Sequence, residues 1–146
     1  MPKKSPKKLN RIIIEIVPSK EMRYATCGDF WVDKDGTRII KVADTGNDDY
    51  NFLIASHEMT EQHFCLKTGI KETDITKFDK HFEEMRKAFP DLVGVMEAGD
   101  HESACYTKQH KLASMFEKWL SDNLAKSMDK NPEEFWEEYN KKVNSL

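Results

Sequence analysis

Three side chains in the segment 56–63, SHEMTEQH, have the types and spacing of a metal site. His57 and Glu61 are four residues apart, so on a helix they share one face with Cβ atoms about 5–6 Å apart. An imidazole nitrogen and a carboxylate oxygen at this spacing can bind one ion at about 2.0–2.2 Å each. Glu58 has the position of the general base in the HExxH motif of zinc hydrolases, with Glu61 in place of the second His. The pattern predicts a metal-dependent hydrolase, with Zn²⁺ as first choice and Mg²⁺ or Mn²⁺ as alternatives.

Further ligands must come from the rest of the chain, because two ligands do not make a metal site. His110 is the first choice, since it completes a set of two imidazoles and one carboxylate. Asp100 is the second, either as a ligand or as the acceptor that fixes a His tautomer, and Asp79 is a further candidate. Tyr106 can donate its hydroxyl to an oxyanion, which makes it a catalytic candidate beside Glu58. The ordinary alternatives are solvated carboxylates and a core tyrosine with a wet hydroxyl.

The elements that must position these residues occur as strands first and helices afterwards. Strands are expected at 12–17, 24–33 and 37–43, and the turn DKDG at 33–36 predicts an antiparallel hairpin. Helices are expected from 48 or 49 to about 68, from 73 or 74 to 89, from 103 to beyond 124, and from Pro132 onward. The side chains expected to face the core are Phe52, Ala55, Met59 and Leu66 on the first helix, and Leu112, Phe116, Leu120 and Leu124 on the third. This order predicts an α+β fold, with a small antiparallel sheet of about three strands followed by about four helices.

Composition limits the class of protein. With 146 residues, the chain suits one domain, expected at 11–146 after a flexible basic tail at 1–10. The net charge of −3 gives no reason to expect a nucleic-acid partner, except through that tail. No run of about 18 apolar residues is present, so we expect no membrane span. Three widely spaced cysteines predict free thiols and a cytoplasmic protein.

The motifs together resemble a family of small phage- and prophage-encoded proteins, mostly uncharacterised, with the strand-then-HExxE-helix layout of zincins. The resemblance rests on the HExxE helix with its Cys and Gly at 57–69, the FD pair at 78–79, the GD pair at 99–100, and ACYTKQH at 104–110. It covers about residues 39–120. The residues that it implies for one site are His57, Glu58, Glu61, Asp79, Asp100, Tyr106 and His110. It implies the cytoplasm of a host cell and no particular substrate, and His101 and Cys105 depart from the family pattern.

Three functions remain open from the sequence. The first is a zincin-type, peptidase-like zinc hydrolase, in which Glu58 takes a proton from the attacking water. The second is a phage-encoded protein that binds or inhibits a host enzyme and keeps a structural or vestigial metal site. The third is a magnesium-dependent nucleotide pyrophosphatase that uses Glu58, Glu61, Asp79 and the pair Glu83–Glu84.

Overall fold

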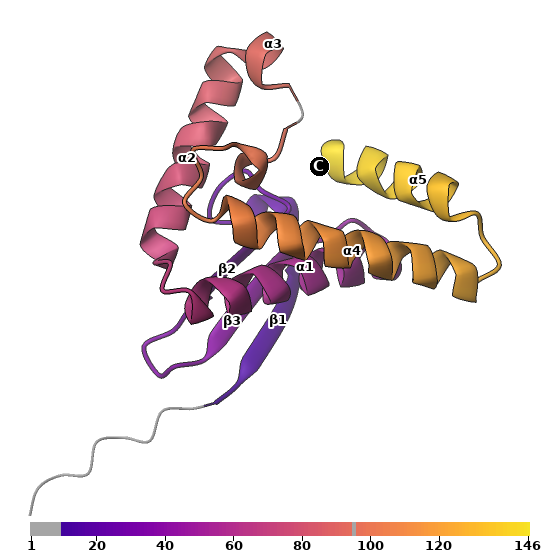
Figure 1. Ribbon diagram of the computed structural model, residues 1–146, viewed down its shortest axis with the longest axis horizontal. Coiled ribbons are helices and arrows are strands. Elements are labelled where there is room, and N and C mark those ends of the chain that lie inside the picture. Colours follow the sequence, from indigo (N-terminus) through magenta and orange to yellow (C-terminus); the bar gives the residue numbers. More distant parts are fainter. Residues whose placement is uncertain (1–9, 95) are drawn as a thin grey trace, which may run out of the picture.

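The computed structural model describes residues 10–94 and 96–146, and it confirms the α+β fold (Figure 1). The predicted basic tail at 1–10 lies outside the described residues, apart from Asn10. The strands are β1 (Ile12–Val17), β2 (Gly28–Val32) and β3 (Arg38–Ala43). The helices are α1 (Asp48–Lys67), α2 (Glu72–Ala88), the single turn α3 (Pro90–Val93), α4 (Thr107–Ser127) and α5 (Pro132–Asn144), with 3₁₀ turns η1 (Ser19–Glu21) and η2 (Ala98–Asp100).

The three strands form a mixed sheet in the order β1-β3-β2. The predicted hairpin is confirmed, because β2 and β3 pair antiparallel around a turn in which Gly36 has φ +88°. The prediction of a wholly antiparallel sheet is wrong, because β1 pairs with β3 in parallel, from Ile12 opposite Arg38 onward. Parallel strands need a long connection, and here that connection contains β2 itself. The β-branched residues that identified β1 suit either direction of pairing.

Helix α1 lies between the sheet and α4, so it is buried on two sides (Figure 1). Its core contacts come from Leu53, Ile54 and Cys65, none of which exceeds 2% exposure. The predicted core positions were wrong except Ala55: Phe52, Met59 and Leu66 are exposed by 52%, 37% and 42%. The polar residues His57 and Glu61 are buried instead, because the face of α1 towards α4 holds the site.

Helix α4 matches the predicted buried face only in part. Leu112 and Phe116 are exposed by 44% and 40%, whereas Ala113, Ser121 and Ala125 are fully buried. Small side chains on the buried face let α1 and α5 approach α4 closely. Leu120 and Leu124 do pack against the core as predicted, so apolar periodicity identified only half of the buried residues correctly.

The predicted start of α5 is confirmed, whereas that of α4 is not. Asn131 accepts a hydrogen bond from the Glu134 backbone, and Pro132 opens α5, as predicted. Phe135 and Tyr139 then pack into the core. Helix α4 begins at Thr107 rather than after Ser103, without a side-chain cap. No helix in the described part of the chain is both long enough and apolar enough to cross a membrane.

Candidate metal centre

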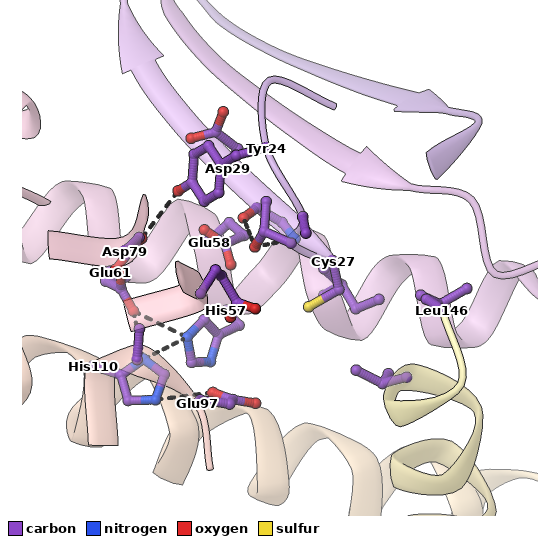
Figure 2. A pocket seen from close by; sticks show the side chains of 18 of the residues that line it. Tyr24, Cys27, Asp29, His57, Glu58, Glu61, Asp79, Glu97, His110 and Leu146 are labelled. Atoms are coloured by element: carbon purple, nitrogen blue, oxygen red, sulfur yellow. Dashed lines mark hydrogen bonds and ion pairs between the residues drawn. The ribbon is translucent and has the colours of Figure 1, made fainter. Parts of the chain in front are cut away.

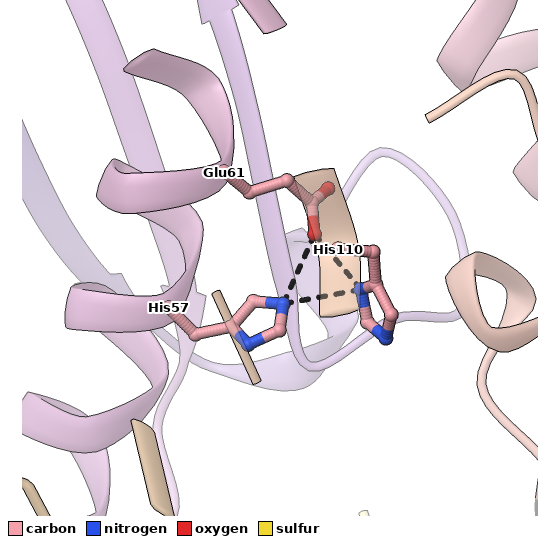
Figure 3. A group of neighbouring side chains, drawn as sticks. All are labelled: His57, Glu61 and His110. Atoms are coloured by element: carbon pink, nitrogen blue, oxygen red, sulfur yellow. Dashed lines mark hydrogen bonds and ion pairs between the residues drawn. The ribbon is translucent and has the colours of Figure 1, made fainter. Parts of the chain in front are cut away.

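Three ligand atoms from two helices converge in the interior (Figure 3). The Nε2 atom of His57 lies 3.0 Å from Glu61 Oε2 and 3.2 Å from His110 Nδ1. His110 Nδ1 lies 2.8 Å from the same Glu61 oxygen. All three residues are buried, with exposed fractions of 6%, 4% and 5%. The predicted meeting of His57, Glu61 and His110 is present in the structure.

Helix geometry places these atoms. His57 and Glu61 are one turn apart on α1, and His110 lies in the first turn of α4. Gly99 in η2 makes room for the His110 ring, because a Cβ at this position would lie 2.3 Å from the His110 Cγ. Ala113, one turn after His110, is fully buried and keeps α4 close to α1. Small residues thus bring the two helices within ligand distance.

The triangle has the dimensions of a metal site. Ligand atoms at about 2.1 Å from one ion, with angles between octahedral and tetrahedral values, are about 3.0–3.4 Å apart. The three observed separations, 2.8 to 3.2 Å, are at or just below this range. Two imidazole nitrogens and one carboxylate oxygen form a donor set that suits zinc.

The outer nitrogens of both imidazoles face carboxylates. Glu117 Oε1 lies 2.8 Å from His57 Nδ1. The angle of this contact is not that of a hydrogen bond, so Nδ1 remains a buried nitrogen without a hydrogen-bond partner. The Nε2 atom of His110 lies 2.9 Å from Glu97 and 3.2 Å from Asp100. Carboxylates at these positions favour a proton on the outer nitrogens, which leaves the inner ones free to bind a metal.

Without a metal, the carboxylates favour the charged imidazoles. Burial lowers the pKa of both rings, but the neighbouring carboxylates outweigh it. The pKa of His110, next to Glu61 and Glu97, rises to about 10. The pKa of His57, next to Glu117 and Glu61, rises well above its usual value. An arriving cation must therefore displace protons from the inner nitrogens.

Glu58 borders the same cavity but is not part of the triangle (Figure 2). It is half-buried, and its pKa is raised well above the usual range, first by burial and then by the charge of Glu61. It lies against Gly28 of β2, where a Cβ would be 2.5 Å from the Glu58 Cγ and Oε1 atoms. A glycine in the strand thus gives the predicted base its position.

The cavity has a volume of about 600 Å³ and contains a second polar cluster. Asp79 on α2 accepts hydrogen bonds from Tyr24, at 3.0 Å, and from Tyr106, each hydroxyl donating to a different carboxylate oxygen. Burial raises the pKa of Asp79 to about 6. The Tyr106 ring stands edge-on to that of His110, with centroids 6.2 Å apart. Asp79 and Tyr106 therefore border the triangle without joining it.

The sequence analysis gave no role to several residues that shape the site. Glu117 follows His110 by seven residues on one face of α4, a signal that was visible in the sequence. Glu97, Tyr24 and Gly28 belong to no motif, and Gly99 was noted only as part of the GD pair at 99–100. Their positions depend on the meeting of distant segments, so spacing alone does not identify them.

The chain matches no family model, no curated protein and no solved structure in the three comparisons made. The resemblance to phage-encoded HExxE proteins therefore stays a prediction.

Proposed function

We propose that this protein is a metal-dependent hydrolase of the zincin type, with Zn²⁺ bound by His57, Glu61 and His110. The observation that carries the proposal is the convergence of three inner ligand atoms, while both outer imidazole nitrogens face carboxylates. A purely structural histidine needs one partner on each nitrogen. It does not need a second imidazole nitrogen 3.2 Å away.

The charges around the triangle also favour a cation. The carboxylates of Glu58, Glu61, Glu97 and Glu117 line the cavity. Within residues 10–94 and 96–146, none of the four forms an ion pair with Lys or Arg. Glu61 is buried, and Glu58 and Glu117 are partly buried. Carboxylates in such places are costly unless a positive charge accompanies them. A divalent ion bound by the triangle would compensate this negative charge after the imidazoles have released their protons.

Bound zinc would supply a Lewis acid that lowers the pKa of water to about 7. The chain's own residues would do the rest. Glu58, held in place by Gly28 and with a raised pKa, suits a group that takes and returns a proton near neutral pH. Tyr106 donates its hydroxyl to Asp79, so it would have to leave Asp79 to reach an oxyanion.

The test measures both the zinc content and the hydrolytic activity of the same protein samples. Protein purified without added metal is expected to contain close to one zinc per chain by elemental analysis. Glu58→Gln should retain the zinc and lose zinc-dependent hydrolysis of a chromogenic ester, while His57→Ala should lose both. Glu137→Gln, at an exposed position of α5 outside the cavity lining, is the matched control. Metal-free protein that binds no added zinc would overturn the proposal.

The magnesium alternative has less support. Its carboxylates do not form a ligand group in the described residues, since Asp79 binds two tyrosines and Glu83 pairs with Arg86. Magnesium also prefers oxygen ligands, whereas this triangle contains two nitrogens.

A further inference from the structure

The two edges of the sheet differ in how their backbone groups are satisfied. On β2, the N–H groups of Phe30 and Val32 point away from β3. Phe30 N donates to Asp29 Oδ1 at 2.9 Å, and Val32 N donates to Glu72 Oε2 at 2.8 Å. Arg23 holds Asp29 in place with two hydrogen bonds. This edge is closed by the protein's own side chains.

On β1, the outer edge is open. The carbonyl groups of Arg11 and Val17 accept from the segment that contains β3. In a parallel pair, alternate residues direct both backbone groups to the same side. The N–H and C=O groups of Ile12, Ile14 and Ile16 therefore point outward, and within the described residues no hydrogen bond to them is present.

The same three residues expose their side chains. Ile12, Ile14 and Ile16 are exposed by 48%, 45% and 44%. Ile12 and Met59 of α1 border a shallow groove of about 280 Å³, so the isoleucines share a face of the sheet with α1. Phe52, two turns before Met59 on α1, extends this apolar face and is exposed by 52%. An exposed apolar edge strand of this kind is a template for pairing with a strand of another chain.

We propose that β1 pairs antiparallel with β1 of a second copy of this chain, joining two sheets into one of six strands. A two-fold axis at Ile14 places Ile14 opposite its own copy and Ile12 opposite Ile16 of the second copy. In this register, the open N–H and C=O groups of all three residues pair with one another. The same residues supply both the hydrogen bonds and the apolar contacts.

A second copy fits this edge better than an unrelated strand because the edge complements itself. The outward positions carry isoleucine only, so the two-fold axis brings no like charges together. Glu15, the one charged residue of β1, faces the other side of the sheet and lies opposite Ile13 of the second copy. Closed two-fold dimers use this kind of self-complementary surface.

The test is the mass of the full chain in solution by light scattering over a dilution series. The expected value is twice the chain mass of 17.0 kDa. Ile14→Glu places two carboxylates on the axis and should weaken dimerisation by at least about 100-fold. Ile14→Pro removes only an outward N–H, which an edge strand tolerates, and should also yield monomer. Retained metal content and circular dichroism would show that both variants are folded.

The control is Trp119→Glu on α4, where Trp119 is exposed by 59% on a different surface. It should leave the dimer intact. A disulfide between two copies carrying Ile14→Cys, in a Cys105→Ser background, would support the register, because paired Cα atoms at about 5.5 Å permit one. A wild-type chain that stays monomeric at high concentration would overturn the proposal. A dimer lost in Trp119→Glu but kept in Ile14→Glu would also overturn it.

Discussion

The cavity is bordered by two polar clusters, one partly buried and one buried, that differ in how their groups are satisfied. In the cluster of Tyr24, Asp79 and Tyr106, each carboxylate oxygen accepts a hydroxyl proton, so all the groups are satisfied within the protein. In the cluster of His57, Glu61 and His110, three ligand atoms point at one another around a common centre. The first cluster is complete without a ligand, and the second has the geometry to bind a cation.

This difference separates two kinds of polar cluster whose residue types look alike. A carboxylate between two phenols links three segments of the chain and stabilises their packing. Two imidazoles and a carboxylate with convergent lone pairs can form a metal-binding site. The following predictions test the contrast, beginning with the largest expected effect.

The strongest test is the pH dependence of metal affinity. Without metal, His57 and His110 have raised pKa values, about 10 for His110, so each must release a proton before binding. Zinc affinity should therefore rise with pH from about 6 to about 9, by up to about 100-fold per pH unit. Competition with a chromophoric chelator measures this, and a flat profile would contradict the protonated cluster.

The raised pKa of His110 also determines how the stability of the metal-free protein changes with pH. The folded-state pKa of His110, about 10, lies above its unfolded value of about 6.5. Its contribution to metal-free stability is therefore full below about pH 6.5 and is lost as the pH rises towards 10. The midpoint of thermal unfolding of metal-free protein should fall across this window.

Glu117→Gln should weaken zinc binding by about 10- to 100-fold. The carboxylate lies 2.8 Å from His57 Nδ1 and also accepts from the Tyr139 hydroxyl, so the amide keeps the shape but removes the charge. Glu97→Gln should have a smaller effect, because Asp100 lies 3.2 Å from the same His110 nitrogen. Zinc affinity in both variants is measured by chelator competition. Equal losses of affinity would contradict the expectation that Asp100 compensates for the loss of the Glu97 charge.

Gly99→Ala should weaken zinc binding by about 10-fold, because the added methyl group displaces the His110 ring. Gly46→Ala is the control, since Gly46 has φ +78° and no atom within 4 Å of an added Cβ. That substitution should lower stability through the backbone alone. If Gly46→Ala lowered zinc affinity as much as Gly99→Ala, the effect would be one of general stability.

Asp79→Asn should leave zinc affinity almost unchanged and destabilise the fold by about 1–3 kcal/mol. Asp79 is bound to two tyrosines rather than to the ligand triangle. Chemical denaturation measures the loss of stability, and zinc titration of the same variant measures affinity. A large loss of zinc affinity would assign Asp79 to the metal site after all.

The sequence predicted the site better than it predicted the surfaces around it. The four-residue spacing of His57 and Glu61 is a local property of a helix, so it follows from the sequence directly. The choice of His110 rested on ligand chemistry, and the structure brings it to the other two residues. The parallel pairing of β1 could not be predicted in this way, since β-branched residues suit both directions.

Most of the buried face of α1 and half of that of α4 were missed for a related reason. Hydrophobic periodicity assumes that apolar residues are inside. Here, the contact between α1 and α4 is made of small and polar residues, among them Ala113 and Ser121, and Phe52 and Phe116 lie outside. A helix that carries a site breaks the pattern on which the prediction relies.

His57 and His110 are 53 residues apart in the chain and belong to different helices. An ion between them would therefore act as a reversible cross-link that closes a loop containing α2, α3 and η2. Removing the ion would release this whole segment from one of its anchors. Amide exchange and protease cleavage between residues 72 and 100 should then accelerate before the sheet is affected.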